Sequence, residues 1–338
     1  MDPIFLAPHP ADSAVVLLMS LSNSSATHLD RAQSNENLRH ELLTEELEAI
    51  GQHCFAIGEY SDVWKEKLPD GEIVAVKVLR GASTNNTEFL TQLDRDLLRN
   101  GKIWKELKHD NVIKFYGLSY NHGIMPALVF PFFANGSVLQ YMKRRKLSDW
   151  KKFQWVDQIA QALHYLHSRD IIHGDLRGAN VLLDDKSNAV VMDYQLSFIL
   201  EASEFTSIKT AGTCRWAAPE IMNPSNSDSL SEPRPNFSKA GDVFAFAMTI
   251  IEIYTESPPF SVKKNDSAVI FAILAGKRPE IPANVAKNKI LAEVVTNCWS
   301  QLPENRPSAE SVCKTLADVP LPSFLRRFLD GIFEYLSF

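Results

Sequence analysis

The feature that most constrains the fold of this chain is a change in sequence periodicity near residue 135. Before it, β-rich runs flank turn signals such as residues 69–71 (PDG), a pattern that predicts strands. After it, apolar residues recur at three- and four-residue steps, as over 156–166, which predicts helices that bury one face. Residues 242–254 are nearly all apolar and predict a buried central helix. A chain that changes from sheet to helices in this way is expected to be of the α+β class.

The first part can be divided further by the same patterns. The runs at 73–78 and 127–130 are rich in β-branched and aromatic residues, whereas 89–107 has helical spacing. The full set of expected elements is a helical lead-in over 43–50, strands at 63–64, 73–78, 112–116 and 127–130, and a helix over 89–107.

These patterns predict four segments in the 338 residues. Ser, Asn and Ala dominate residues 20–37, so 1–40 is expected to be a disordered tail. A sheet-rich unit then spans 41–133 and a helical unit spans 134–320. Residues 321–338 predict an amphipathic helix, which either packs on the helical unit or meets a partner or membrane surface.

Composition excludes several classes of protein. A net charge of -6 and a pI of about 5.9 give no basic face for a nucleic acid. No run approaches the roughly 20 apolar residues of a membrane span, and the N-terminus does not resemble a secretory signal. The four cysteines have no metal-binding spacing and are expected to be buried thiols. We therefore expect a soluble, cytoplasmic protein without a nucleic-acid partner.

Five short motifs follow one another along the chain. They are VAVK at 74–77, HGDLRGAN at 173–180, MDYQ at 192–195, AAPE at 217–220 and ENRP at 304–307. Each match is weak or moderate alone. Their order and spacing make coincidence negligible.

This series resembles the protein kinase superfamily over about residues 43–316. The first four runs are similar to its V-A-I-K, H-R-D-L-x-x-x-N, D-F-G and A-P-E motifs. Residues 212–216, the HGD sequence and Cys298-Trp299 resemble the tyrosine-kinase-like group, in the style of fungal serine/threonine kinases. The resemblance implies a two-lobed kinase fold, in which the small lobe is an antiparallel sheet with one helix and the large lobe is mainly helical.

The resemblance also implies roles for charged residues, because phosphoryl transfer depends on positioning and charge neutralisation. Lys77 would pair with the phosphates of ATP. Asp175 would orient the substrate hydroxyl and accept its proton, and Arg177 would lie near the transferring phosphate. Asn180 and Asp193 would hold Mg²⁺.

Further residues are expected to bind the nucleotide or to support the site. The expected nucleotide contacts are Gly58 and Ser61 over the phosphates, Val63, Ala75 and Leu182 around the adenine, and Pro131 and Phe133 in the hinge. Val63, Ala75 and Leu182 could equally be plain core. Glu220 is expected to pair with Arg306, and Asp242 to brace the catalytic loop.

Departures from the family pattern leave two functions open. The loop at 56–63 keeps only Gly58 of its glycines, Asn100 stands where a glutamate would pair with Lys77, and Gln195 replaces a glycine. These changes favour a pseudokinase that binds nucleotide and acts through a regulatory protein partner. The retained Asp175 favours a kinase that transfers phosphate from Mg-ATP to a protein substrate. Thr213, seven residues before Glu220, favours a serine or threonine hydroxyl as the acceptor, with tyrosine left open.

Overall fold

The computed structural model describes residues 41–42, 46–58, 61–80, 87–123, 125–196, 199, 213–222, 237–320 and 322. The expected tail over 1–40 and, apart from residue 322, the expected terminal helix over 321–338 lie outside these residues.

Within this described part, an antiparallel sheet in the order β1-β3-β4-β6-β5 forms the first half of the fold, and β2 also pairs with β3. The strands are β1 (Glu48–Ala49), β2 (Ala56–Ile57), β3 (Ser61–Lys67), β4 (Ile73–Leu79), β5 (Gly117–Ser119) and β6 (Ala127–Pro131). The predicted turn joins β3 to β4 through Gly71, whose φ of 94° favours glycine. The strands predicted at 63–64, 73–78 and 127–130 are thereby confirmed.

The register of the sheet gathers several side chains on one face. Val63 of β3 lies opposite Lys77 of β4, and Ala75 of β4 lies opposite Phe130 of β6. Directly paired residues share a face, and so do residues two apart on one strand. Val63, Ala75, Lys77 and Phe130 therefore project from the same face of the sheet.

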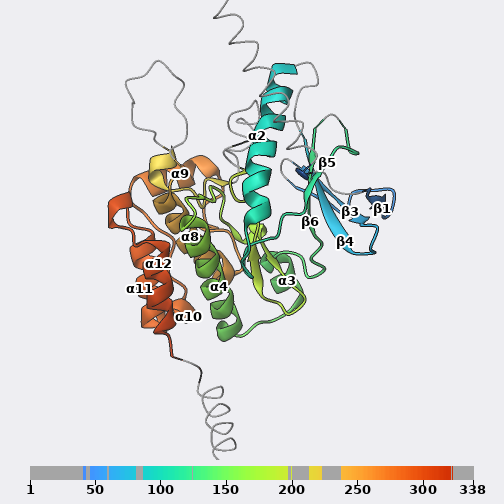
Figure 1. The fold of residues 1–338 in the computed structure, drawn as a ribbon. Coiled ribbons are helices and arrows are strands. Elements are labelled where there is room, and N and C mark those ends of the chain that lie inside the picture. The colour runs from blue at the N-terminus through green and yellow to red at the C-terminus, as the bar shows by residue number, and fades with distance from the viewer. Residues whose placement is uncertain are drawn as a thin grey trace, which may run out of the picture.

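Helix α2 (Thr87–Glu106) lies beside the sheet (Figure 1) and confirms the helix predicted over 89–107. Its buried side chains include Leu93 and Leu97, which are four residues apart on one apolar stripe, and the adjacent Leu98. Trp104 is buried in its last turn. This stripe fixes which face of α2 turns toward the rest of the fold.

The second half is mainly helical. Its helices are α3 (Val138–Arg144), α4 (Asp149–His167), α7 (Pro219–Met222), α8 (Lys239–Thr255), α9 (Asp266–Leu274), α10 (Ala283–Ala286), α11 (Lys289–Cys298) and α12 (Ala309–Ala317). Helix α8 is buried along almost its whole length and packs against α4 and α11, which confirms the predicted central helix. The sheet and α2 lie on one side of the molecule, and α8, α11 and α12 on the other (Figure 1).

A small hairpin connects these parts. Strands β7 (Val181–Leu183) and β8 (Ala189–Val191) pair antiparallel, and the 3-10 helix η1 (Gly178–Asn180) leads into β7. The hairpin touches the first half through a bridge between Val112 and Val191. The segments that end at Asn180 and begin at Met192, on either side of the hairpin, therefore lie at the junction of the two halves.

Two local expectations were wrong. Glu48–Ala49 is a strand and not part of a helix over 43–50, because it pairs with the edge of β3, where the Ile50 amide also donates to the Lys65 carbonyl at 3.0 Å. The strand expected over 112–116 lies instead at Gly117–Ser119. Val112 and Ile113 pair with β8 instead, since Val112 bridges to Val191 and the Ile113 amide donates to the Val191 carbonyl at 2.9 Å. Tertiary pairing overrides local propensity at both places.

The architecture confirms the α+β, two-lobed kinase fold. A small lobe of antiparallel sheet with α2 is followed by a mainly helical large lobe.

Candidate active site

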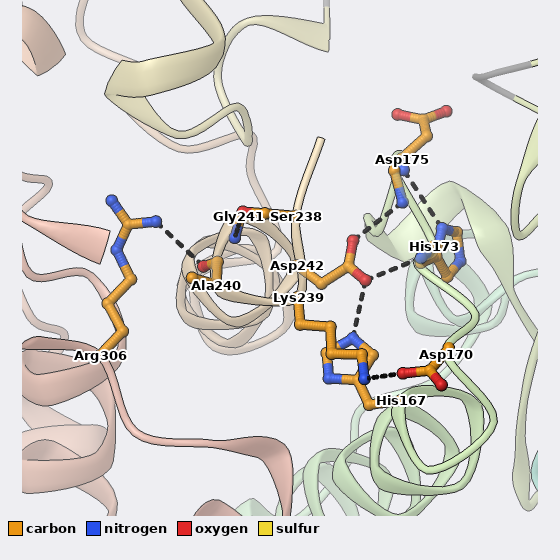
Figure 2. Close-up of polar contacts among 11 residues, drawn as sticks. His167, Asp170, His173, Asp175, Ser238, Lys239, Ala240, Gly241, Asp242 and Arg306 are labelled. Carbon is orange, nitrogen blue, oxygen red and sulfur yellow. Dashed lines mark hydrogen bonds and ion pairs between the residues drawn. The ribbon is translucent and has the colours of Figure 1, made fainter. Parts of the chain in front are cut away.

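A buried carboxylate at the start of α8 holds the loop that carries Asp175 (Figure 2). Asp242 Oδ1 accepts from the Gly174 amide at 2.8 Å, and its Oδ2 accepts from the His173 amide at 2.7 Å. His167 Nε2 lies 2.8 Å from the same Oδ2. Because Asp242 is 2% exposed and His173 is 0% exposed, solvent does not compete for these bonds. The expectation that Asp242 braces this loop is confirmed.

Gly174, where the family pattern has an arginine, has a φ of 81°. Glycine adopts this left-handed conformation without the steric cost that a side chain brings. The residue thus allows the backbone to present both amides to Asp242.

The carboxylate of Asp175 is fixed by its neighbours along the same loop. Asn180 Nδ2 donates to the Asp175 carbonyl at 2.8 Å and to its Oδ2 at 2.9 Å. Arg177 Nε lies 3.4 Å from the same Oδ2. With its amide nitrogen used in this way, Asn180 offers its carbonyl oxygen Oδ1 as a ligand for a hard cation.

Asp193 follows the hairpin and meets Lys77 from the sheet. The Met192 amide donates to the Asn180 carbonyl at 2.9 Å, which ties this segment to the loop. Asp193 Oδ2 forms an ion pair with Lys77 Nζ, and the two side chains are 11% and 7% exposed. Lys77, Asn180 and Asp193, predicted from separate motifs, are therefore brought together.

The other oxygen of Asp193 supplies the test of whether a cation fits here. Among the residues that the structure describes, Asp193 Oδ1 is buried and has no hydrogen-bond partner. Burying a carboxylate oxygen without a hydrogen-bond partner costs free energy. A divalent cation bound to that oxygen would remove the cost. The same part of the chain contains no group of three or more His, Cys, Asp or Glu arranged for a metal. Phosphate oxygens would complete the coordination shell of a cation bound here, as is usual for Mg²⁺.

Gly58 and Ser61, the two residues expected to cover the phosphates, are hydrogen-bonded to each other. The Gly58 amide donates to the Ser61 carbonyl at 2.7 Å, and a Cβ on Gly58 would come within 3.2 Å of Ser61. Arg80 also donates to the Gly58 carbonyl. A side chain at position 58 would crowd Ser61, which explains why a glycine is favoured at this position.

The expected adenine contacts lie at the sheet and the hairpin. Val63 and Ala75 are half-buried on the face that carries Lys77. Leu182 lies on β7, also half-buried, and bridges to Ser137 at the start of α3. These three residues therefore come from the sheet of the small lobe and from the hairpin between the lobes.

The hinge residues Pro131 and Phe133 flank Phe132, whose amide donates to the Ile73 carbonyl at 3.3 Å. The ring of Phe55 meets the Phe132 ring edge-on, with centroids 5.0 Å apart. The sequence reasoning missed this aromatic pair. An aromatic residue immediately before the loop at 56–63 was the available signal.

Glu252 was also missed. It lies on α8, and its Oε2 accepts from the Gly178 amide at 2.8 Å and from Trp216 Nε1 at 3.0 Å. Burial raises the pKa of the Glu252 carboxyl to about 7, although these hydrogen bonds and the charge of Arg177 act in the opposite direction. An acidic residue within the apolar run 242–254 was the signal that could have found it.

The side chain of Asn100, at the position where a glutamate would pair with Lys77, hydrogen-bonds within its own helix. Its Nδ2 donates to the Asp96 carbonyl one turn earlier in α2, at 2.7 Å. Lys77 pairs with Asp193 instead.

The pairing expected between Glu220 and Arg306 is confirmed. The guanidinium contacts both carboxylate oxygens, at 2.6 and 2.9 Å, and the Arg306 side chain is 0% exposed. This bidentate pair fixes the AAPE segment to the end of the large lobe.

Comparisons with known proteins indicate the same family as the fold and the geometry of the site. The family described as "Protein tyrosine and serine/threonine kinase" matches residues 47–316. The serine/threonine-protein kinase CTR1 of Arabidopsis thaliana is 31% identical over 254 residues, which cover 73% of this chain and 28% of the relative. The dual specificity protein kinase shkD of Dictyostelium discoideum is 30% identical over 286 residues, 82% of this chain and 35% of the relative.

A further relative, the serine/threonine-protein kinase STY46 of Arabidopsis thaliana, is 28% identical over 269 residues, 79% of this chain. The chain spans less than half the length of these relatives, with 43% of STY46 covered. None of the helices in the described residues combines the length and apolar character needed to cross a bilayer. With its fold, its site and its match to the family over 47–316, the chain belongs to the protein kinase family and to its tyrosine-kinase-like group.

Proposed function

We propose that this chain transfers a phosphoryl group from Mg-ATP to a serine or threonine hydroxyl of a protein substrate. The observation that carries the proposal is the meeting of Lys77, Asp175, Asn180 and Asp193, with Asp193 Oδ1 buried and lacking a partner among the described residues. The family uses ATP with a divalent cation. Two relatives named as serine/threonine-protein kinases, STY46 and CTR1, support this choice of acceptor.

Anionic and neutral oxygen ligands would bind the cation, and a cationic side chain would bind the phosphates. When bound, Mg²⁺ would neutralise charge on the phosphates. Asn180 Oδ1 and Asp193 would hold this cation, and the Lys77 ammonium would hold the phosphates. The ion pair between Lys77 and Asp193 keeps both groups in place until phosphates attract the ammonium.

Asp175 would orient the acceptor hydroxyl and take its proton. Its carboxylate is already aimed by the hydrogen bond from Asn180 and by the nearby Arg177. The loop that carries it is held from beneath by Asp242. A base fixed in this way need not reorganise during the reaction, which is the main source of catalysis in such sites.

The nucleotide would lie between the lobes. Gly58 and Ser61 would cover its phosphates. Val63, Ala75 and Leu182 would enclose the adenine. The Pro131 carbonyl and the Phe133 N–H would form hydrogen bonds with the edge of the adenine. We propose a small lobe over 41–133, a large lobe over 134–320, a tail over 1–40 and a terminal helix over 321–338.

The test is phosphate transfer from labelled ATP with Mg²⁺ to the protein itself and to a generic protein substrate. Wild type should transfer label and Asp175→Asn should not. Asp185→Asn is the matched control, because Asp185 is an exposed carboxylate of the same lobe in the β7–β8 hairpin. Folded wild-type protein that transfers no label would overturn the proposal.

A pseudokinase that acts as a nucleotide-binding scaffold is the second candidate. It is favoured by Asn100, whose amide turns back into α2 while Lys77 pairs with Asp193. Such a scaffold would act through a regulatory protein partner, and its function would survive Asp175→Asn. A phosphotransferase would lose its function in that variant.

A further inference from the structure

Gln195 holds an unusual backbone conformation next to the proposed cation site. Its φ is 61°, a left-handed conformation that is disfavoured for any residue with a Cβ. Strained residues of this kind persist only where surrounding contacts over-determine them. Two such contacts are present. The Gln195 amide donates to the His173 carbonyl at 3.0 Å, and Gln195 Oε1 accepts from Trp104 Nε1 at 3.0 Å.

Trp104 presents its indole N–H to this segment from the last turn of α2. The side chain is buried, and its ring meets Phe115 and Tyr194 edge-on, with centroids 5.5 and 6.1 Å away. These packed rings fix the direction of the N–H. A buried indole donor requires a partner, and Gln195 supplies it.

The family pattern would anchor α2 to β4 through a glutamate paired with Lys77, whereas this hydrogen bond anchors α2 to the segment that carries Asp193. In this chain Asn100 is occupied with its own helix, and Lys77 turns to Asp193. Gln195 lies two residues after Asp193, so a bond that fixes Gln195 also limits how Asp193 can turn.

We propose that Trp104 and Gln195 are positioning residues, and that their hydrogen bond couples α2 to the Asp193 segment in a chain whose α2 lacks the glutamate that would pair with Lys77. The proposal rests on the proposed function for its effect on catalysis, but the coupling itself is a property of the folded chain. Without the bond, α2 moves more independently of the Asp193 segment, and Asp193 spends less time in its cation-binding orientation.

The test uses the full chain with variants that differ by one hydrogen-bonding group. Gln195→Met keeps the length but removes the acceptor, Gln195→Glu keeps an acceptor, and Trp104→Phe keeps a ring but removes the donor. Trp150→Phe is the matched control, because Trp150 stacks on Phe153 in α4 and lies outside this contact. Hydrogen exchange of peptides from the second half of α2 is measured for all of them, with transfer kinetics at varied ATP.

Gln195→Met and Trp104→Phe should each speed exchange in α2 by about tenfold, the ratio for one buried hydrogen bond lost. Each should lower kcat by a similar factor with a smaller change in the KM for ATP. The double variant should be no worse than either single variant, since both remove the same bond. Gln195→Glu should restore most of the exchange protection and of kcat, and Trp150→Phe should change neither quantity.

Unchanged exchange in both single variants would overturn the proposal, and so would losses that add in the double variant. If wild type transfers no phosphate, the proposed function fails, while the exchange measurements still decide whether the coupling exists. Protection lost equally in Gln195→Glu and Gln195→Met would also count against it, because the acceptor would then be irrelevant.

Discussion

The catalytic loop and helix α2 both contact the segment that carries Asp193, but they are held in different ways. The loop is tied to α8 by Asp242, through the backbone amides of His173 and Gly174. Helix α2 reaches the Asp193 segment through two side chains, Trp104 and Gln195. The large-lobe support thus follows the family pattern, whereas the small-lobe support is particular to this chain.

The difference shows which parts of such a site tolerate change. A buried carboxylate that satisfies several amides leaves those donors unpaired when it is replaced, so Asp242 is difficult to substitute. A link between two side chains can be exchanged for another link of similar strength. This account explains how Asn100 and Gln195 can depart from the pattern while Asp175 and Asp193 remain.

The largest effect is expected at Asp242. Asp242→Asn places an NH₂ group against buried donors, the amides of His173 and Gly174. We expect a loss of about 4 kcal/mol in the free energy of unfolding, together with the loss of phosphate transfer. Urea unfolding followed by circular dichroism measures the first, and Asp185→Asn is the control. A loss near that of the control would show that the loop is held elsewhere.

The next effect separates buried from exposed support within the large lobe. Arg306→Met strands Glu220 without its bidentate partner and should cost about 3 kcal/mol in unfolding free energy. Lys314→Met breaks an i,i+4 pair with Glu310 whose side chains are 74% and 57% exposed, and should leave the unfolding free energy almost unchanged because solvent screens this pair. The two variants are compared by their unfolding midpoints in urea. Similar losses of unfolding free energy in the two variants would show that the buried pair stabilises the lobe no more than the exposed pair does.

A pH effect of intermediate size should arise at Glu252. Burial raises the pKa of this carboxyl from 4.5 to about 7 in the folded state, against the opposing influence of Arg177 and with a small contribution from Asp175. Between these values the folded protein binds the proton and the unfolded chain releases it. This contribution to stability is therefore full below pH 4.5 and is lost as the pH rises through about 7.

The measurement is the free energy of unfolding at several pH values for wild type and Glu252→Gln. The glutamine keeps an acceptor for Gly178 and Trp216 but does not titrate. Wild type should carry an additional negative slope of up to about 1.4 kcal/mol per pH unit relative to the variant. Parallel curves would mean that Glu252 titrates normally.

The smallest effect is a gain on the α2 side. Asn100→Glu would offer Lys77 a carboxylate from α2 and release Asp193 toward the cation, so kcat should rise about threefold. Asn100→Gln, which adds length without charge, should leave kcat unchanged. Initial rates at saturating ATP measure both variants. A fall in kcat for Asn100→Glu would indicate that the Trp104–Gln195 bond already sets α2 in its working position.

Much of this arrangement was predictable from sequence, and the exceptions have physical causes. The helix at α2, the central helix α8, the pairing of Glu220 with Arg306 and the role of Asp242 all depend on local periodicity or on motifs with fixed spacing. The strand at Glu48–Ala49 and the hydrogen bond from Trp104 to Gln195 depend on where distant segments meet. No local pattern encodes such a meeting, and an amide or an aromatic side chain is compatible with many partners.

The proposed cation site is tested most directly by nucleotide binding with and without Mg²⁺. Calorimetric titration with a non-hydrolysable ATP analogue would compare wild type with Asp193→Asn. We predict that Mg²⁺ tightens binding to wild type by about tenfold or more and leaves binding to the variant unchanged, because Asp193 Oδ1 lies in the proposed site, is buried and has no hydrogen-bond partner among the described residues. A wild-type affinity that is the same with and without Mg²⁺, or a full Mg²⁺ effect in Asp193→Asn, would contradict the account.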